Sequence, residues 1–221
     1  MALTMEVSLT RPEDKPLVLA AEVIQAGGII VYPTETLYGI GANAWDGSAI
    51  AKVRALKHRT DQKPILVIAG SQDQLRSLTD EISPLARRFI DAFWPGPLTL
   101  VFTASKSVPD ILSRGTGTIG VRIPSSPVCL RLLELAGCPL TSSSANLSGK
   151  PPLYNVAEIR RAIPKGVDLF LDGGQLPPSK PSTVLDVTGG VSRLLREGTI
   201  SEERLRAVDP HLVVEQPLAS P

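Results

Sequence analysis

The sequence predicts an α/β fold: a single domain built on a twisted sheet of mixed parallel and antiparallel strands, with helices flanking the sheet. Short apolar runs that suit buried strands alternate along the chain with segments whose apolar residues recur at helical spacing. Some strands are separated only by a glycine-containing turn, which predicts hairpins and therefore antiparallel pairs. At 221 residues the chain is long enough for one substantial core, and neither a linker nor an internal repeat divides it.

The individual elements follow from local signals taken in chain order. Ser83-Pro84 and Ser126-Pro127 each combine an N-cap with a proline suited to the first helical turn. The expected helices cover 14–26, 50–56 with Asp46 or Ser48 as its cap, a short segment around 75–78, 84–93, a turn near 111, 127–136, 156–163 and a short segment after Ser201. The expected strands cover 5–9, 29–32, 65–69, 98–103, 119–123, a short run at 140, 167–171, 184–187 and 191–195.

The ends of the chain and the cysteines suggest where the domain lies and where the protein works. We expect residues 1–208 to form the domain and residues 209–221 to be a loose C-terminal tail, since the end is proline-rich. The N-terminus has no basic-then-apolar signal pattern, and no apolar run approaches the ~20 residues of a membrane span. Cys129 and Cys138 are not in a C-x-x-C arrangement and suit reduced, buried positions. We therefore expect a cytoplasmic protein.

Composition and motif searches argue against several function classes. The net charge is +1 and aromatic residues make up 4% of the chain, so neither bulk charge nor base-stacking platforms favour nucleic-acid binding as the main role. Gly115, Gly117 and Gly120 form a literal G-x-G-x-x-G, but it precedes a strand and opens no helix, which excludes the dinucleotide-binding interpretation. His58 and His211 are too far apart in the sequence to suggest a metal site, and no Ser-His-Asp set is apparent.

The stretch from Gly27 to Ala44 is the most informative part of the chain. Its apolar run ends at Pro33 and is followed by hydroxyl, carboxylate and phenol side chains, from Thr34, Glu35, Thr36 and Tyr38. In α/β sheets, ligands usually bind just beyond the carboxyl ends of strands. The alternative is an ordinary polar loop closed by turn glycines.

Cations and hydroxyls gather at the edges of other predicted loops. Lys57, Arg59 and Lys63 lie within seven residues, either as a solvated helix end or, if the helix unwinds there, as ligands of one anion. Arg122 lies within a strand and needs a partner, so a structural ion pair and an anion-binding role are equally plausible. Arg196 follows a strand and has the same two interpretations.

The serine-rich run at 142–146 is a further candidate. Ser142, Ser143, Ser144 and Asn146 crowd hydroxyls and an amide into one loop. Such a loop can cap its own backbone or bind phosphate oxygens.

Taken together, these segments resemble the YrdC-like family in its short form. The resemblance covers about residues 15 to 200 and rests on six segments in the family's order: PTETLYGIGANA (33–44), LKHRTDQKPILV (56–67), FWPGPLTLVF (93–102), TIGVRIPSSP (118–127), TSSSANLSGKPP (141–152), and STVLDVT with LLREG (182–198).

The resemblance implies both a reaction and a role for each candidate residue. Active members of the family are threonylcarbamoyl-AMP synthases, which condense L-threonine, bicarbonate and ATP, with Mg²⁺ on the triphosphate, to give threonylcarbamoyl-AMP and pyrophosphate for modification of adenosine in tRNA. By position, the residues that resemble the threonine contacts are Thr36, Arg122, Ser142 and Ser182. Those that resemble the ATP contacts are Arg59, Lys63, Thr118, Ser144 and Arg196. Lys57 with Arg59, and Ser144 with Asn146, complete the catalytic K-x-R and S-x-N pairs.

Three departures from the family pattern bear on substrate binding. Thr60 stands where a proline is more usual, Ile68 stands where longer members carry a histidine, and Pro152 falls on a nucleotide-contacting position. A non-catalytic RNA-binding module and a divergent paralogue with another nucleotide activity remain the alternatives. Because such paralogues usually lose parts of the K-x-R and S-x-N pairs, the intact pairs favour the synthase.

Overall fold

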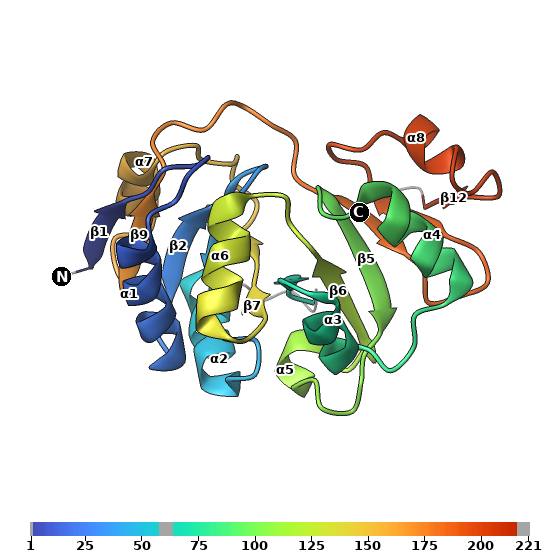
Figure 1. Cartoon of the computed structure of the whole chain (residues 1–221), viewed down its shortest axis with the longest axis horizontal. Coiled ribbons are helices and arrows are strands. Elements are labelled where there is room, and N and C mark those ends of the chain that lie inside the picture. The colour runs from blue at the N-terminus through green and yellow to red at the C-terminus, as the bar shows by residue number, and fades with distance from the viewer. Residues whose placement is uncertain (1, 58–63, 216–221) are drawn as a thin grey trace.

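The computed structural model describes residues 2–57 and 64–215, and its first strand (dark blue) lies at the opposite end of the molecule from its last helix (red) (Figure 1). The helices are α1 (Asp14–Gln25), α2 (Gly47–Leu56), α3 (Gln72–Leu78), α4 (Pro84–Phe93), α5 (Asp110–Ser113), α6 (Pro127–Ala136), α7 (Val156–Ala162) and α8 (Glu202–Arg206). The strands are β1 (Leu3–Glu6), β2 (Ile30–Pro33), β3 (Tyr38–Gly41), β4 (Val67–Ile68), β5 (Leu98–Thr103), β6 (Thr118–Arg122), β7 (Leu140–Thr141), β8 (Ser143–Ser144), β9 (Leu169–Asp172), β10 (Thr183–Asp186), β11 (Arg193–Arg196) and β12 (Val213–Val214).

The strands form two mixed sheets, which confirms the predicted fold class. One sheet has the order β1-β9-β2-β3-β8, with parallel pairs on the β1 side and antiparallel pairs on the β8 side. The other has the order β12-β11-β10-β5-β6-β4-β7, in which parallel and antiparallel pairs alternate. We refer to them below as the first and second sheet.

The two sheets meet where the chain passes from β7 to β8. Only Ser142 separates these strands, so the chain leaves the second sheet at Thr141 and enters the first at Ser143. The meeting is reinforced by an antiparallel bridge between Asn43 and Leu140 and by a hydrogen bond from the Thr141 N–H to the Ala42 carbonyl. The serine-rich run is therefore held at the junction of the sheets.

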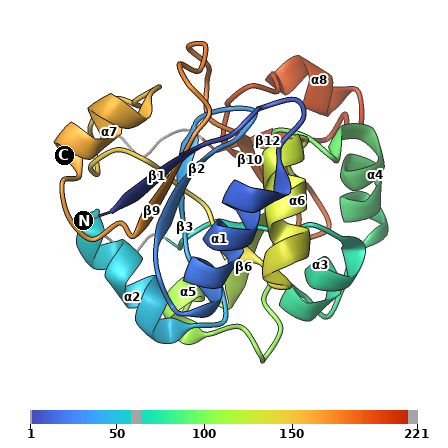
Figure 2. The same cartoon turned by 60° about the vertical axis from the view of Figure 1, so that its left-hand side comes forward.

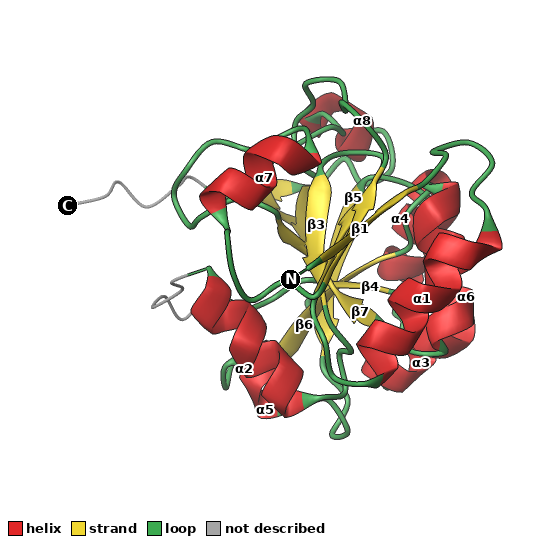
Figure 3. Cartoon of the chain, turned by 90° about the vertical axis from the view of Figure 1, so that its left-hand side faces the viewer, coloured by secondary structure: helices red, strands yellow, loops and turns green. Residues whose placement is uncertain are grey.

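Helices cover both sides of the strands, as Figure 3 shows with α2, α5 and α7 on one side and α1, α3, α4 and α6 on the other. The amphipathic α1 and α6 lie side by side (Figure 2) and pack against β2 through apolar residues such as Leu17, Ile24 and Leu132. A larger apolar cluster lies around β5, β6, α2 and α4, with Phe89 and Phe102 among its buried side chains. These two clusters bury the apolar side chains of the strands away from solvent, which stabilises both sheets.

The local helix signals are borne out. Asp46 caps α2 by accepting hydrogen bonds from the N–H groups of Ser48 and Ala49. Ser83 and Ser126 cap α4 and α6, and a proline occupies the first turn of each. Asn155 and Ser201 cap α7 and α8 in the same way.

Two short strands, β3 and β8, lie where the sequence predicts polar loops. The polar run after Pro33 returns immediately as β3, which pairs antiparallel with β2, so this stretch is a hairpin and not an open loop. Ser143 and Ser144 form β8 against β3. The predicted end of the strand at Pro33 is confirmed, because β2 ends at Pro33 itself, opposite Tyr38.

The domain also extends further than predicted. The tail was expected to begin at residue 209, but Asp209 is buried and its carboxylate accepts a hydrogen bond from the Ser192 hydroxyl at 2.5 Å. Leu212 is buried in the larger cluster, and β12 pairs in parallel with β11. The ordered domain therefore runs at least to Glu215, because these residues complete the edge of the second sheet.

Candidate functional site

A polar cavity of about 300 Å³ lies where the two sheets meet. Its walls come from the β2–β3 turn, the end of α2, the ends of β6 and β11, the β7–β8 junction and the segment before β10. The lining residues are Thr34, Thr36, Leu37, Tyr38, Gly39, Lys57, Pro64, Leu66, Arg122, Ser142, Ser143, Ser144, Asn146, Ser148, Gly149, Pro181, Ser182 and Arg196. Both sheets contribute, so the cavity depends on how they are placed relative to each other.

The β2–β3 turn presents threonine hydroxyls to the cavity. The Thr34 Oγ1 accepts hydrogen bonds from the N–H groups of Thr36 and Leu37 at 3.1 Å each, and it lies 2.7 Å from the Leu37 carbonyl. The Thr36 Oγ1 lies 3.0 Å from that of Thr34. The side chain of Thr34 thus fixes the turn, as short hydroxyl residues commonly do, and this places Thr36 in the wall.

Arg122 has the structural ion pair that the sequence allowed and also lines the cavity, while its anion-binding role stays a prediction. It ends β6 inside the fold, lines the cavity, and donates from Nη1 to the Glu35 Oε1 at 2.8 Å and to the Thr36 Oγ1 at 3.3 Å. Only 6% of the Arg122 side chain is exposed, so the acidic partner offsets part of the cost of burying its charge. The residue has a structural ion pair and also faces the cavity.

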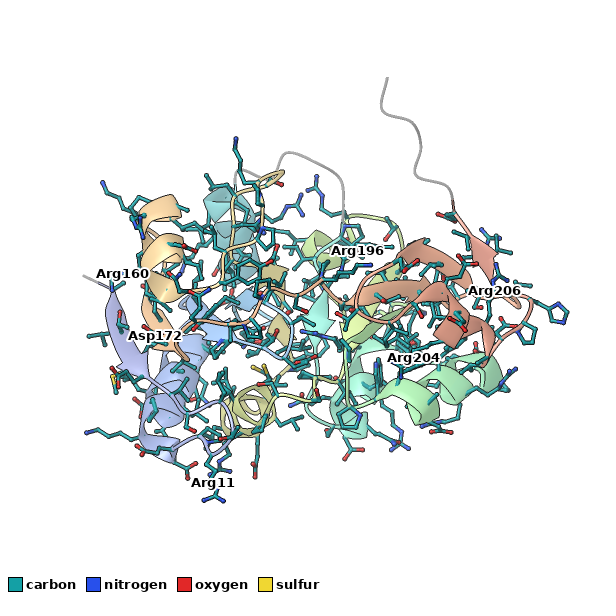
Figure 4. All side chains as sticks on the ribbon, turned by 90° about the horizontal axis from the view of Figure 1, so that it is seen from above. Arg11, Arg160, Asp172, Arg196, Arg204 and Arg206 are labelled. Atoms are coloured by element: carbon teal, nitrogen blue, oxygen red, sulfur yellow. The ribbon has the colours of Figure 1, made fainter. Side chains whose placement is uncertain are left out.

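A second arginine approaches the cavity from the end of β11. Arg196 donates to the Ser182 carbonyl from Nε at 3.2 Å and from Nη2 at 2.8 Å, and Nη2 also reaches the Ser182 hydroxyl at 3.3 Å. That hydroxyl lies 2.9 Å from the Thr99 Oγ1. Seen from above, Arg196 lies near the middle of the molecule, between the two groups of strands (Figure 4). Burial and the neighbouring charge of Arg122 lower the pKa of Arg196, as expected for two cations beside one cavity.

Lys57 reaches the cavity from the end of α2. It is the C-cap of α2, it is buried, and its Nζ donates to the Ser144 carbonyl and lies 3.4 Å from the Ser144 hydroxyl. The Ser144 hydroxyl in turn donates to the Asn146 Oδ1 at 2.6 Å, and the Asn146 amide donates to the Lys150 carbonyl. Lys57 of the first predicted catalytic pair therefore meets the Ser144–Asn146 pair at β8, since Lys57 and Asn146 both contact Ser144.

Most of the predicted site residues converge on this cavity. Eight of the eleven line it, namely Lys57, Ser144, Asn146, Thr36, Arg122, Ser142, Ser182 and Arg196. Thr118 does not, because it begins β6 and Arg122 ends it, roughly 13 Å away along an extended strand. Arg59 and Lys63 lie outside the described residues. The individual roles assigned to all eleven stay predictions.

Two of the departures from the family pattern also have a place in the fold. Ile68 is fully buried in the apolar cluster of α1 and α6 and does not line the cavity. Pro152 also lies outside the cavity lining. Thr60, the third departure, falls outside the described residues.

Some of the lining residues were not singled out by the sequence. Leu66 and Pro181 are among them. The sequence offered no signal for Leu66, because residues 65–69 form a continuous apolar run without alternation; in the structure its neighbours Ile65 and Val67 are buried while Leu66 lines the cavity. Pro181 likewise offered no signal, since only the return of the chain from β9 to β10 brings it to the cavity.

The nearby tyrosines and cysteines are structural by their contacts. The Tyr38 hydroxyl donates to the Gly174 carbonyl at 2.8 Å and accepts from the Gly173 N–H at 2.9 Å. Burial raises the pKa of Tyr38 to about 12 and that of Cys129 to about 12. Both groups therefore stay protonated near neutral pH, and Cys129 is not an activated nucleophile.

The fold and the cavity define a class: an α/β protein with a polar cavity between two mixed sheets, lined by cationic and hydroxyl side chains. The family model Sua5_yciO_yrdC, whose description is "Telomere recombination", matches residues 22–198 of this chain. The chain belongs to this family, which confirms the resemblance that the motifs indicated.

Individual relatives agree with this assignment. A Coxiella burnetii protein named threonylcarbamoyl-AMP synthase is 35% identical over 176 residues, which is 79% of this chain and 95% of the relative. A Pyrococcus abyssi protein of the same name is 36% identical over 198 residues, 90% of this chain and 58% of the relative. Against the longer relatives the chain thus spans less than two thirds of their length.

Solved structures give the same result. P. abyssi Sua5 complexed with L-threonine matches with a TM-score of 0.92 at 34% identity, over 97% of this chain and 63% of that protein. E. coli YciO matches with a TM-score of 0.85 at 29% identity, over 93% of this chain and 100% of that protein. Within residues 2–57 and 64–215, no helix is both long and apolar enough to cross a membrane.

Proposed function

We propose that this protein is an L-threonylcarbamoyladenylate synthase, which condenses L-threonine, bicarbonate and ATP to threonylcarbamoyl-AMP and pyrophosphate. The observation that carries the proposal is the convergence of Arg122, Lys57 and the Ser144–Asn146 pair on one cavity between the sheets. Relatives that match most of this chain bear the synthase name, and the P. abyssi relative was crystallised with L-threonine.

The proposed chemistry needs no protein nucleophile. The amine of threonine adds to carbon dioxide derived from bicarbonate and loses a proton, which gives a carbamate. A carbamate oxygen then attacks the α-phosphorus of ATP, the bond to the bridging oxygen breaks, and pyrophosphate leaves. The protein's part is to hold anionic groups in line and to stabilise the charge that develops on the transferring phosphoryl group. The enzyme is in this sense a nucleotidyltransferase.

The cavity residues divide naturally between the two substrates. Arg122 suits the carboxylate of threonine because an arginine edge can bind a carboxylate with two hydrogen bonds. Thr36, Ser142 and Ser182 supply nearby hydroxyls. We assign Lys57, Ser144, Asn146 and Arg196 to the phosphates, and by resemblance Arg59, Lys63 and Thr118 as well.

Mg²⁺ would arrive with ATP as part of the substrate, since phosphate oxygens are its preferred ligands. Over the described ranges, no three His, Cys, Asp or Glu side chains form a metal-binding group. The remaining partners are the proteins that carry the threonylcarbamoyl group to adenosine in tRNA, and tRNA or duplex RNA itself as an accessory partner. A cytoplasmic location belongs to the same proposal.

A second candidate is a divergent paralogue that acts on another nucleotide substrate. It is favoured by the match to E. coli YciO over the whole of that protein. The presence of Lys57, Ser144 and Asn146 together in the cavity favours the synthase over this alternative.

The decisive experiment is pyrophosphate release by the purified protein with ATP, bicarbonate and Mg²⁺, with and without L-threonine. L-serine is the control amino acid, and the nucleotide product is identified by mass. We expect threonine-dependent release and a threonylcarbamoyl-AMP mass. Release that is independent of threonine would favour the paralogue. Salt-sensitive RNA binding without any turnover would favour a binding module.

A further inference from the structure

Glu35 contacts the candidate site without lining the cavity. It lies in the β2–β3 turn, and 17% of its side chain is exposed. Its Oε1 accepts from the Arg122 Nη1 at 2.8 Å. Its other oxygen, Oε2, is buried and has no hydrogen-bond partner among the described residues. A buried carboxylate oxygen without a partner is costly, so this arrangement calls for an explanation.

The way in which Glu35 pairs with Arg122 is informative. A carboxylate commonly takes two parallel hydrogen bonds from a guanidinium. Here both protein contacts of Arg122 are made by Nη1, one with Glu35 and one with the Thr36 hydroxyl. The Nε–Nη2 edge of Arg122 has no hydrogen-bond partner among the described residues, although Arg122 lines the cavity. The ion pair thus holds one corner of the guanidinium and leaves an edge for a ligand.

The surroundings explain why a carboxylate suits this position. Arg122 lies close enough to Arg196 to lower the pKa of Arg196, so the two cations repel each other. Arg196 is held by Ser182, and no acidic partner of Arg196 is present within the described ranges. Glu35 offsets the charge of Arg122 and ties it to the β2–β3 turn. Without that tie, Arg122 would be free to move away from Arg196.

We propose that Glu35 is a positioning residue. By holding Nη1 of Arg122, it presents the Nε–Nη2 edge to the cavity as a two-point binding site for the carboxylate of the amino-acid substrate. This inference rests on the proposed function, in that it names how the same cavity selects an amino acid.

The test measures ligand binding without turnover, by titrating purified full-length protein in the absence of bicarbonate. The ligands are L-threonine, L-threoninamide, which lacks the carboxylate charge, and ATP. The variants are Glu35→Ala and Glu35→Gln. The control is Glu134→Gln, which alters an exposed acid paired with Arg131 at 2.7 Å, away from the cavity.

We expect the wild-type protein to prefer threonine to threoninamide. Glu35→Ala should weaken threonine binding by roughly 10- to 100-fold, because a small misplacement of a clamping arginine has a large effect. The affinity for threoninamide should fall less than the affinity for threonine, so the ratio of the two affinities should move closer to one. Glu35→Gln should be intermediate, because its amide oxygen can still accept from Nη1. ATP binding should change less than about twofold, and Glu134→Gln should resemble wild type.

Several results would overturn the inference. One is a Glu35→Ala protein that binds threonine as tightly as wild type or more tightly. Another is a Glu35→Ala protein whose affinities for threonine and ATP fall by the same factor. A third is a Glu35→Ala protein that keeps the full wild-type preference for threonine over threoninamide. If Glu35→Ala does not fold, the same comparison of the two ligands in Glu35→Gln decides. If the wild-type protein binds no threonine and shows no threonine-dependent pyrophosphate release, then the proposed function is wrong, and the inference about Glu35 is wrong with it.

Discussion

Lys57 shows how one residue can link two parts of the fold. Its backbone caps α2, while its ammonium is buried and donates to the carbonyl of Ser144 in β8. A buried ammonium requires acceptors, and Ser144 supplies a carbonyl and a nearby hydroxyl. Because Asn146 orients that hydroxyl, the position of the lysine charge depends on the serine-rich run as much as on the helix. The ammonium of Lys57, which we propose to bind phosphate, is thus positioned by the hydroxyl of Ser144 and the amide of Asn146.

Removing the Ser144 hydroxyl tests this arrangement. Ser144→Ala should lower threonine-dependent pyrophosphate release by about 100-fold, the effect typical of losing one polar group at a developing charge. The fold should persist, because the Lys57 bond to the Ser144 carbonyl remains. The matched control is Ser179→Ala, a serine outside the cavity whose hydroxyl bonds, among the described residues, only to the carbonyl of Lys180. Initial rates and circular dichroism of both variants make the comparison, and a Ser144→Ala protein with wild-type turnover would show that the assignment is wrong.

At the scale of elements, what could be predicted depends on where the signal lies. The longer helices and β5 carry their own caps and periodicity, so the sequence predicts them nearly to the residue. By contrast, β3 contains Gly39 and Gly41, which disfavour a strand in isolation. It forms because β2 and β8 pair with its two edges. An added Cβ at Gly41 would lie 2.6 Å from the ring of Tyr32, so a close tertiary approach determines that residue.

The sequence also predicted only part of the candidate site, namely the residues whose position along the chain carries a signal. Polar residues that follow strands were recognisable from position, and the family resemblance joined them into one site. Leu66 and Pro181 were not recognised, because their place in the wall follows from how the sheets meet. The two-residue strand β8 has too few residues for any periodic signal.

The packing of β6 against Leu66 gives a prediction about the shape of the cavity. A Cβ at Gly120 would lie 2.5 Å from the Leu66 Cδ2, and Leu66 lines the cavity. Gly120→Ala should therefore push Leu66 from its position, lower the free energy of unfolding by about 1–3 kcal/mol and weaken substrate binding. Gly47→Ala is the control, because no atom of the described residues, apart from its own chain neighbours and helix backbone, lies within 4 Å of its Cβ position. Urea unfolding and the KM for threonine measure the two effects. If both stay at wild-type values in Gly120→Ala, Leu66 does not shape the site.

On the scale of the whole molecule, the cavity lies between two sheets that are joined by few connections. The chain crosses between them three times: from β3 to β4 by way of α2, at Ser142, and between β9 and β10, where residues 173–182 connect one sheet to the other. Tyr38 holds the start of that last connection, and Arg196 holds its end through Ser182. Both holding residues line the cavity, so a ligand there touches the groups that fix the two sheets relative to each other.

This arrangement predicts that substrates stabilise both sheets together. With L-threonine and a non-hydrolysable ATP analogue, hydrogen exchange should slow in β3 and β8 of the first sheet and in β6, β10 and β11 of the second. A ligand at 100 times its Kd adds about 2.7 kcal/mol to the free energy of unfolding, so the melting temperature should rise as well. The helix α5, which contributes no lining residue, is the internal reference. Slower exchange confined to one sheet would mean that the ligand binds to that sheet alone, because a ligand held by Thr36 and Lys57 on one side and by Arg122 and Arg196 on the other must restrict both.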